Sequence, residues 1–328
     1  MKVKVPKSIE KFSLALKERF EKEDKEIKIS RQKKRKIQNQ LTLDFFGIKI
    51  PEINNENLFE NLTKEKLPNL KIICWNINGL RSIINKGDLQ YLIEKEKPEI
   101  LCLNETKIDV ITLRKEKYEL LFNKNYLTYW NFSNEKKGYS GVSIFSKFKP
   151  IKIIYEMGIK KHDKEGRILL IEYNIFILIC VYFPNSGKER LNYRTKEWDI
   201  DFYNFIKEIK NKFNNKSIII CGDLNVVPEK MDIYDIENYN EIIDFRKEER
   251  ENFFLLLNNM NFVDSFRFLN KGKICYSWFG NLWDKKNYKG CRCDFFLVDK
   301  NIINDIKKSD ILEKYNGSDH VPICLIFK

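Results

Sequence analysis

Acidic, amide and imidazole side chains recur in this 328-residue sequence where apolar runs meet polar ones. They stand beside five separate runs: Asn76 and Asn78, Glu105, Asp223 and Asn225, Asp294, and Asp319 with His320. If the ends of those runs converge, these groups form one cluster of hard oxygen donors. Such donors suit Mg²⁺ or Mn²⁺ better than Zn²⁺, which prefers several His or Cys ligands. A single acid at a strand end is usually a turn or cap residue, so the prediction depends on the recurrence.

The sequence has only two histidines, and one of them, His320, follows Asp319 directly before the apolar run 323–327. This arrangement is compatible with an active-site imidazole or with a capped turn before a strand. The other histidine, His162, lies in the charged, turn-like stretch "KKHDKEGR", and we predict that it is a surface residue.

Short apolar runs rich in β-branched residues follow one another from Leu70 onward and predict the strands that would carry these groups. The runs are 70–76, 99–105, 141–147, 168–173, 175–183, 217–223, 293–299 and 322–327. Helix-capable segments lie between some of them, notably Thr195–Phe213 and Lys247–Asn259. Many short buried strands with interspersed helices predict an α/β protein with packed sheets.

The net charge of +13 indicates an acidic partner, and nucleic acid is the usual one. The general lysine richness of an Asn-, Ile- and Lys-heavy chain would give the same charge without any partner. With 43% hydrophobic residues, the chain can bury the core of one large domain with an appendage, or of two small domains.

The eight cysteines do not form a disulfide framework, because only Cys291 and Cys293 are close in sequence and no C-x-x-C pair exists. We interpret them as small core residues in a reducing compartment. The longest apolar run, 175–183, is far shorter than the roughly 20 residues that span a bilayer. The first residues lack the apolar segment of a secretory signal. We therefore expect neither secretion nor a membrane partner.

The composition changes near residue 68. Residues 1–68 are charged and Asn-rich, and we predict a basic extension that is either partly helical or disordered, with 69–328 as the folded domain that carries the groups above. The run "RQKKRK" (31–36) fits a nuclear-import signal or a phosphate-contacting patch, and equally a solvated charged run.

Seven blocks of the sequence resemble, in order, the motif set of the exonuclease III-type AP endonucleases, members of the endonuclease/exonuclease/phosphatase superfamily. The blocks are "KIICWNINGLRS" (71–82), "PEILCLNETKI" (98–108), "GYSGVSIFSK" (138–147), "VYFPNSG" (181–187), "CGDLNVVPEKMD" (221–232), "DSFR" (264–267) and "GSDHVP" (317–322). The resemblance implies a four-layered α/β sandwich of two mixed β-sheets flanked by helices. It also implies hydrolysis of the DNA backbone 5′ to an abasic site in base excision repair, with Mg²⁺ as cofactor and Mn²⁺ as an alternative. The family often adds 3′-phosphodiesterase or 3′-5′ exonuclease activity.

The resemblance assigns roles to the metal side of the site. Glu105 matches the principal metal ligand, and Asn78 and Asp319 match positions beside the metal. Asp223 and Asn225 match the family's GDLN pair and are assigned both to the metal and to catalysis. Asp223 would orient or deprotonate the attacking water, or serve the leaving group.

The remaining matched residues would act on the phosphate. Asn225 and Asn185 would donate hydrogen bonds to it, and Tyr182 would place its hydroxyl on it. His320 resembles the active-site histidine, and Asp294 would hold one ring nitrogen and favour the protonated ring. The other nitrogen would then face a phosphate oxygen as a cationic donor.

Substrate contacts fall where the sequence also departs from its relatives. Asn76 and Arg81 are assigned to substrate binding from the first block, and Trp278 fits the aromatic wall of the abasic-sugar pocket. Relatives have larger side chains where this chain has Cys291 and Cys293, so we expect a roomier pocket and weaker abasic selectivity. Lys188 replaces an Arg of some relatives and lacks its planar fork.

Other functions are compatible with the same motifs. A retroelement-type DNA-nicking endonuclease, or a phosphatase acting on inositol phosphates or lipids, would share the fold, although Trp278 and the basic charge favour double-stranded DNA. A non-catalytic DNA-binding repair partner would require a broken metal site. We expect such an enzyme in the nucleus or in another DNA-containing compartment.

The segment "QLTLDFFG" (40–47) resembles the clamp-binding peptides of replication and repair proteins. Gln40, Leu43, Phe45 and Phe46 follow the required order, with the aromatic pair one residue early. Residues 40–46 would bind a sliding clamp in this interpretation. The alternative is a hydrophobic segment that packs the arm onto the catalytic domain.

Overall fold

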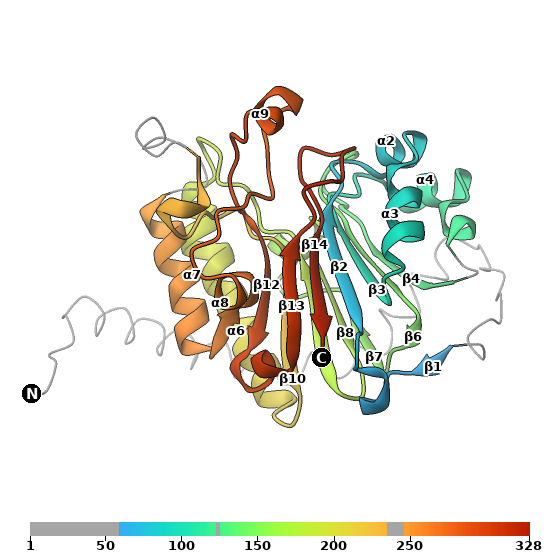
Figure 1. Cartoon of the computed structure of the whole chain (residues 1–328), viewed down its shortest axis with the longest axis horizontal. Helices are drawn as coiled ribbons and strands as arrows, with labels where there is room; N and C mark the ends of the chain where they lie inside the picture. Colours follow the sequence, from blue (N-terminus) through green and yellow to red (C-terminus); the bar gives the residue numbers. More distant parts are fainter. Residues whose placement is uncertain (1–58, 123–124, 235–245) are drawn as a thin grey trace, which may run out of the picture. The chain divides into compact units, whose positions relative to one another are not determined.

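The computed structural model describes residues 59–122, 125–234 and 246–328, and two six-stranded mixed sheets dominate it (Figure 1). The first sheet has the order β13 (Ile306–Ile311), β14 (Ile323–Phe327), β2 (Lys71–Asn76), β3 (Ile100–Asn104), β5 (Val142–Ser146), β4 (Leu127–Asn131). The second has the order β11 (Phe262–Asp264), β12 (Asp294–Asp299), β10 (Ser217–Asp223), β9 (Phe176–Val181), β8 (Ile168–Glu172), β7 (Lys152–Ile154). All eight predicted strands are present.

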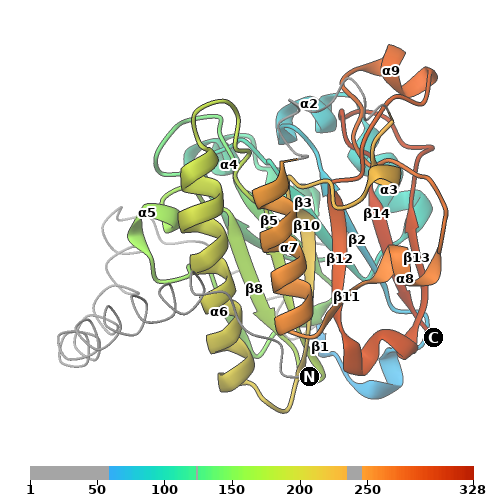
Figure 2. The ribbon, with the colours of Figure 1, turned by 90° about the vertical axis from the view of Figure 1, so that its left-hand side faces the viewer.

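Helices cover the outer faces of the two sheets, as Figure 2 shows for α6 and α7. On the first sheet these are α2 (Leu80–Asn85), α3 (Asp88–Glu96) and α4 (Val110–Lys115), and on the second α6 (Asp199–Lys212) and α7 (Lys247–Asn259). Shorter helices are α5 (Lys160–Asp163), α8 (Ser265–Leu269) and α9 (Leu282–Lys286). Short 3₁₀ or π-helical segments are η2 (Lys64–Lys66), η3 (Tyr118–Leu121), η4 (Tyr193–Trp198), η5 (Lys230–Asp232) and η7 (Lys300–Asp305). The four-layered α/β sandwich is thereby confirmed.

The predicted helix 247–259 matches α7, whereas the segment 195–213 is divided between a π-helical turn, η4, and α6. None of the helices in the described part of the chain has the length and apolar character that a membrane crossing requires.

Alternation along the strands explains why their sequences are apolar throughout. In β2, Ile72 and Cys74 face the other sheet, whereas Ile73 and Trp75 face the helices. Each central strand is therefore covered by the other sheet on one face and by helices on the other. Its residues are apolar throughout, whereas a strand with one face in water alternates apolar and polar residues.

The chain described before residue 69 contributes to this core. Strand β1 (Glu60–Asn61) pairs in parallel with β6 (Phe148–Lys149), and Leu62 is fully buried between the sheets. Most of the predicted basic extension, including the run 31–36 and the clamp-like segment 40–46, lies outside the described residues.

The prediction that His162 is a surface residue is wrong. Its ring is 1% exposed, with Nδ1 2.9 Å from the hydroxyl of Tyr193 and Nε2 2.9 Å from Oδ2 of Asp201. Trp198 also contacts the ring edge-on. The neighbouring Lys160 and Lys161 are exposed. The charged composition of the stretch therefore describes the outer face of α5 and does not show that His162 lies on its inner face.

Candidate active site

Most of the predicted site residues lie at one edge of the sandwich, where β2, β3 and β10 end, which is the upper edge in Figure 1. There β2 and β3 end side by side in the first sheet, with Asn76 opposite Asn104. In the second sheet, Asp223 at the end of β10 is paired with Asp294 at the start of β12. The loop that carries His320 enters β14 at the same edge.

Asn76 joins the two sheets inside the site. Its Nδ2 donates to Oε1 of Glu105 and to Oδ2 of Asp223, each at 2.9 Å. The side chain is fully buried, so both hydrogen bonds are shielded from water. Asn76 thus fixes the separation of two acids that come from different sheets.

His320 lies between two carboxylates. Its Nδ1 is 2.8 Å from Oδ2 of Asp294, and its Nε2 is 3.8 Å from Oδ2 of Asp223. Burial disfavours the charged ring, but the two carboxylates outweigh it and raise the pKa of His320 well above its usual value. The expected partner, Asp294, is therefore the observed one, and Asp319 points elsewhere.

Burial also acts on Asp223. It raises the pKa of this carboxyl to about 8, with the neighbouring Asp294 adding to the rise and His320 opposing it. A carboxyl with such a pKa exchanges protons close to neutral pH.

Glu105, Asn78 and Asp319 form a group of oxygen donors beside this pair. Lys107 places its ammonium 2.6 Å from Oε2 of Glu105 and donates to Oδ1 of Asn78. Asn78 in turn donates to Oδ1 of Asp319 at 2.9 Å. Oxygen atoms of Glu105 and Asn78 thus both contact the ammonium group of Lys107. Hard oxygen donors of this kind fit Mg²⁺ or Mn²⁺.

Opposing effects set the ionisation of this group. Burial alone would raise the pKa of Glu105, but hydrogen bonds from Lys107 and Asn76 lower it. Burial likewise opposes ionisation of Asp319, and the charge of His320 with the hydrogen bond from Asn78 lowers its pKa. Both carboxylates are therefore ionised at neutral pH, as metal ligands must be.

Asn225 and Asn185 extend the site from Asp223, and Tyr182 lies beside Glu105. Asn185 donates to Oδ1 of Asn225 at 3.1 Å, and the backbone N–H of Asn225 donates to Oδ1 of Asp223 at 2.9 Å. Burial raises the pKa of Tyr182 well above its usual value, and the nearby Glu105 adds to the effect. The Tyr182 hydroxyl therefore keeps its proton and remains a donor.

The residues assigned to the sugar pocket are close together, whereas two other predicted substrate contacts lie outside the cluster. Trp278 donates from Nε1 to Oδ2 of Asp319 at 3.3 Å, and its backbone pairs with that of Cys291. Cys291 and Cys293 are buried beneath it. Arg81 instead bonds to Thr112 of α4, and Lys188 is exposed on the loop after β9.

Several site residues have a backbone conformation that L-residues rarely adopt. The φ angles are +46° at Asn78, +52° at Glu105, +53° at Lys107 and +44° at Asn225. Such conformations cost on the order of 1 kcal/mol or more each and persist where the surrounding fold imposes them. These four are among ten non-glycine residues with positive φ in the described part of the chain, so the loops of the site share this conformation with turns elsewhere.

The sequence prediction missed supporting residues of the site. Lys107 lies in the quoted block "NETK" but was given no role. Arg167 lies 4.7 Å from the centre of the Tyr182 ring and donates to Glu165 and Tyr139. Glu165 is two residues away in sequence, but Tyr139 and Tyr182 come from other segments, so the local pattern does not show that Arg167 lies beside the Tyr182 ring.

A second supporting group holds the segment that carries Asp294. Arg292 is fully buried and donates from Nε and Nη2 to the two carboxylate oxygens of Asp232, and from Nη1 to Asp264. Bidentate pairing of this kind fixes orientation as well as charge. The pairing of Arg292 with Asp232 and Asp264 therefore holds the start of β12, two residues further along the chain, in place.

Comparison with known proteins places this geometry in context. A profile of the Endonuclease/Exonuclease/phosphatase family matches residues 73–320. The DNA-(apurinic or apyrimidinic site) endonuclease of Dictyostelium discoideum is 35% identical over 275 residues, which are 81% of this chain and 73% of that protein. The exodeoxyribonuclease of Bacillus subtilis is 36% identical over 263 residues, which are 78% of this chain and 99% of that protein.

Solved structures agree on the fold. The AP endonuclease of Leishmania major aligns with a TM-score of 0.71 at 23% identity, over 86% of this chain and 99% of that one. A 3′-5′ exonuclease from Neisseria meningitidis aligns with a TM-score of 0.69 at 24% identity, over 79% of this chain and 99% of that one. At these identities the likeness shows the architecture alone.

Proposed function

Because this chain belongs to the endonuclease/exonuclease/phosphatase family, we propose that it cuts the DNA backbone on the 5′ side of abasic sites in base excision repair. Its relatives at 35% and 36% identity are an AP endonuclease and an exodeoxyribonuclease, so the chain is a nuclease that hydrolyses DNA phosphodiesters. The finer assignment is supported by the arrangement of acids and imidazole at one edge of the sandwich.

The central observation is that Asp294, His320 and Asp223 form a continuous line of contacts. With Nδ1 held by Asp294, the protonated ring presents Nε2 to a phosphate oxygen and stabilises the charge that develops on it. In the reaction, the oxygen of water bonds to phosphorus and the bond to the 3′ oxygen breaks. Asp223 either accepts the proton of the water or donates one to the leaving oxygen.

Glu105, Asn78 and Asp319 are the residues that would hold a divalent ion, and family nucleases are typically metal-dependent. Mg²⁺ there would neutralise charge on the phosphate as a Lewis acid. Tyr182, Asn185 and Asn225 would donate to the same phosphate. Because Lys107 bonds to two of the ion's expected ligands, we expect its ammonium to move when the ion binds.

The selectivity for damage is the finer part of the proposal. Trp278 would provide the aromatic wall of the pocket, and it packs against Cys291 and Cys293, which are small side chains. A flipped-out sugar fits such a pocket, and a sugar that carries a base is excluded only if the walls are close. We therefore expect 3′-5′ exonuclease activity beside abasic incision.

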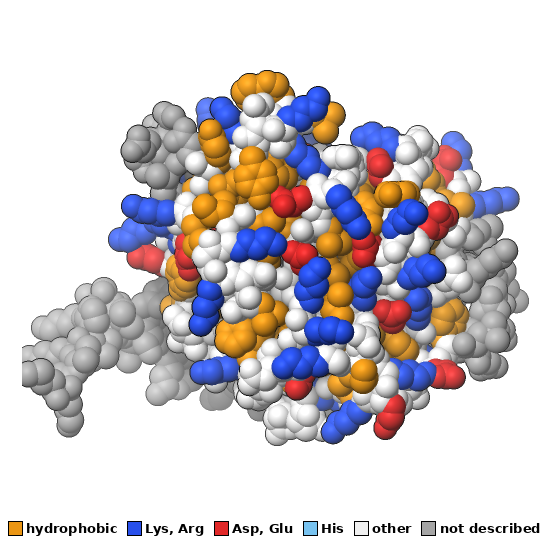
Figure 3. Space-filling model, in the orientation of Figure 1, with side chains coloured by type: hydrophobic (Ala, Val, Ile, Leu, Met, Phe, Trp, Pro, Cys, Tyr) orange, Lys and Arg blue, Asp and Glu red, His pale blue; other side chains and the backbone are white. Residues whose placement is uncertain are grey.

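The charge of the surface supports a nucleic-acid substrate but does not locate it. Lysine and arginine side chains spread over the whole face shown in Figure 3, with acidic ones among them. The net charge of +13 therefore strengthens association with DNA in general, and the position of the DNA follows from the site.

One gel assay tests the proposal. Duplexes with an abasic analogue, a plain nick or an intact strand are incubated with Mg²⁺, with Mn²⁺ and with EDTA. We expect incision 5′ to the analogue, slower shortening from the nick, no cut in the intact strand and no activity in EDTA. Equal cutting of intact and abasic duplexes would favour a general nicking endonuclease instead.

A further inference from the structure

Four of the eight cysteines occupy equivalent places in the four central strands. Cys74 lies in β2, Cys102 in β3, Cys180 in β9 and Cys221 in β10. Each comes two residues before a residue of the active-site edge, namely Asn76, Asn104, Tyr182 and Asp223 respectively. Because side chains alternate along a strand, a spacing of two puts each thiol on the same face as the residue above it.

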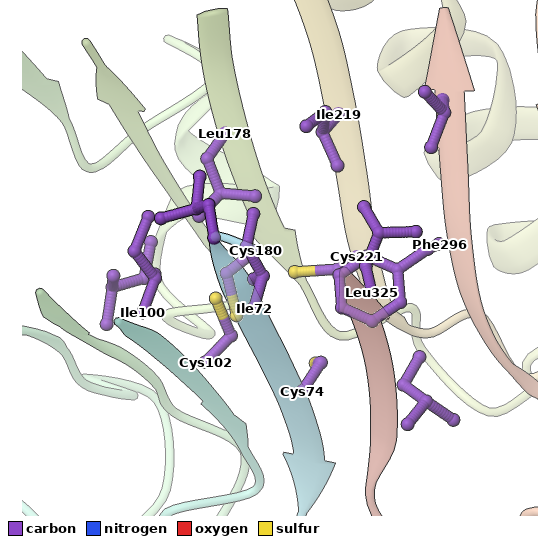
Figure 4. Packing of buried hydrophobic residues seen from close by; sticks show 14 of the residues in the cluster. Ile72, Cys74, Ile100, Cys102, Leu178, Cys180, Ile219, Cys221, Phe296 and Leu325 are labelled. Carbon is purple, nitrogen blue, oxygen red and sulfur yellow. The ribbon is translucent and has the colours of Figure 1, made fainter. Parts of the chain in front are cut away.

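The strand register brings these thiols together in pairs. Cys74 is directly opposite Cys102 in the first sheet, and Cys180 is directly opposite Cys221 in the second. All four side chains are at most 1% exposed and lie in the core between the sheets. Figure 4 shows them in the space between the strands, with the sulfur atoms of Cys102 and Cys221 turned toward Cys180.

The distances between the sulfur atoms suit a single ion. Those of Cys74, Cys180 and Cys221 all lie within 4.8 Å of one another. Metal–sulfur bonds of about 2.3 Å require sulfur atoms roughly 4 Å apart. A contraction of under about 1 Å, within reach of χ1 adjustments, would therefore close the site. Cys102 lies directly opposite Cys74 on the neighbouring strand and outside this group of three.

We propose that Cys74, Cys180 and Cys221, with Cys102 beside them, bind one soft d¹⁰ metal ion such as Zn²⁺ or Cu⁺. Thiolates select such ions, whereas Mg²⁺ and Mn²⁺ prefer oxygen. Each thiol that bonds as a thiolate releases its proton to water, and no electron is transferred. This sulfur site is distinct from the oxygen site of Glu105, Asn78 and Asp319.

Asn104 connects the sulfur site to the active site. Its Oδ1 lies 3.6 Å from the sulfur of Cys74 and accepts from the backbone N–H of Asp223 at 3.1 Å, while its Nδ2 donates to the sulfur of Cys180 at 3.4 Å. An ion on the two sulfurs would redirect both thiol contacts. Binding of a soft metal is therefore expected to shift the position of Asp223.

The test uses the full-length, fully reduced protein under anaerobic conditions, with Cd²⁺ as the spectroscopic probe and excess Mg²⁺ present to fill the oxygen site. We expect one Cd²⁺ per chain with thiolate-to-metal absorption in the ultraviolet, reached slowly because the site is buried. Cys74→Ala, Cys180→Ala and Cys221→Ala should each weaken binding by roughly tenfold or more. Competition with Zn²⁺ and with Cu⁺ then identifies the preferred ion.

Two sets of controls make the result specific. Cys275→Ala and Cys324→Ala remove buried cysteines outside the cluster, and they should bind Cd²⁺ as the parent does. Cys293→Ala removes the thiol that lies beside Asp294 and His320, where a soft ion also has ligands. Loss of the signal in Cys293→Ala, with retention in the three cluster variants, would overturn the proposal.

Folding of the variants is checked by circular dichroism. If a cluster variant does not fold, the cadmium NMR chemical shift of the parent protein decides, because it reports the number of bound sulfurs. A shift typical of three or four sulfur ligands supports the site. A shift typical of oxygen and nitrogen ligands, or no binding at all, contradicts it.

Discussion

Oδ2 of Asp294 lies 2.8 Å from Nδ1 of His320, although the two residues belong to different sheets. Asp294 opens β12 in the second sheet, and His320 precedes β14 in the first. Both side chains are almost completely buried. This contact therefore ties the chemistry of the site to the packing of one sheet on the other.

The pairing predicts how substitutions combine. His320→Ala should reduce single-turnover incision of an abasic duplex severely, and Asp294→Asn should reduce it too, because Asp294 orients and charges the ring. The double variant should be little worse than His320→Ala alone, since residues that act as a unit are not additive. A product of the two single effects would show that they act independently.

The oxygen-donor group predicts a loss of turnover without a loss of binding. Glu105→Gln should lower incision by several orders of magnitude at limiting Mg²⁺, because the amide removes the charge that holds the ion. Affinity for the abasic duplex, measured in EDTA at fixed salt, should change little. Glu135→Gln breaks a surface pair with Lys164 and is the matched control, since such pairs contribute little. Near-parental incision by Glu105→Gln would place the metal elsewhere.

The raised pKa of Asp223 predicts a pH-dependent stability. In the metal-free protein, the folded state keeps this proton up to about pH 8, whereas the unfolded chain releases it near 3.8. Folding thus binds a proton between these values, and stability falls as pH rises through that window. The pKa of His320 is also raised, and its contribution to stability is lost only above about pH 6.5.

The test compares Asp223→Asn with the parent by urea unfolding in EDTA from pH 5 to pH 6.5. The substitution removes the ionisable group at position 223. The free energy of unfolding of the variant should therefore rise, relative to that of the parent, by up to about 1.4 kcal/mol per pH unit. The pKa of Asp163 is raised to about 6, but this residue is present in both proteins, so its contribution cancels in the difference between them. A constant difference across this range would mean that Asp223 ionises normally.

The small wall of the sugar pocket predicts a change of selectivity. Cys291→Trp should raise the ratio of abasic incision to 3′-5′ shortening of undamaged ends, because a base would then clash with the larger wall. Taking the ratio removes the effect of any unfolded fraction, which matters because Cys291 is 5% exposed and overpacking is a risk. An unchanged ratio would show that Cys291 does not line the pocket.

The N-terminal arm carries a separate prediction. A peptide of residues 31–50 should bind a sliding clamp with micromolar affinity by isothermal titration calorimetry, because Leu43 and two Phe rings can share one face of a short turn. Phe45→Ala/Phe46→Ala should abolish binding. No binding by the parent peptide, together with a lower melting temperature of the full-length double variant, would favour packing of the segment on the catalytic domain.

The sequence by itself determined the strands and the chemistry at their ends. Continuous apolar runs such as 217–223 marked strands covered on both faces, and Glu105 and His320 were recognisable because they stand in motif blocks. These signals depend on residues that are close in sequence, so the sequence alone is enough to detect them. The same reasoning failed for His162, because the composition of a short segment does not show which side faces inward.

Only the tertiary structure decided which side chains meet. Asn76 bonds to Asp223 across 147 positions of sequence, and Lys107 acquires its place because Glu105 and Asn78 converge on it. The four cysteines were visible as core residues, yet their clustering depends on β2 lying beside β3, β9 lying beside β10, and the two sheets facing each other. Such contacts join residues far apart in the chain, and strand order and sheet packing alone bring them within bonding distance.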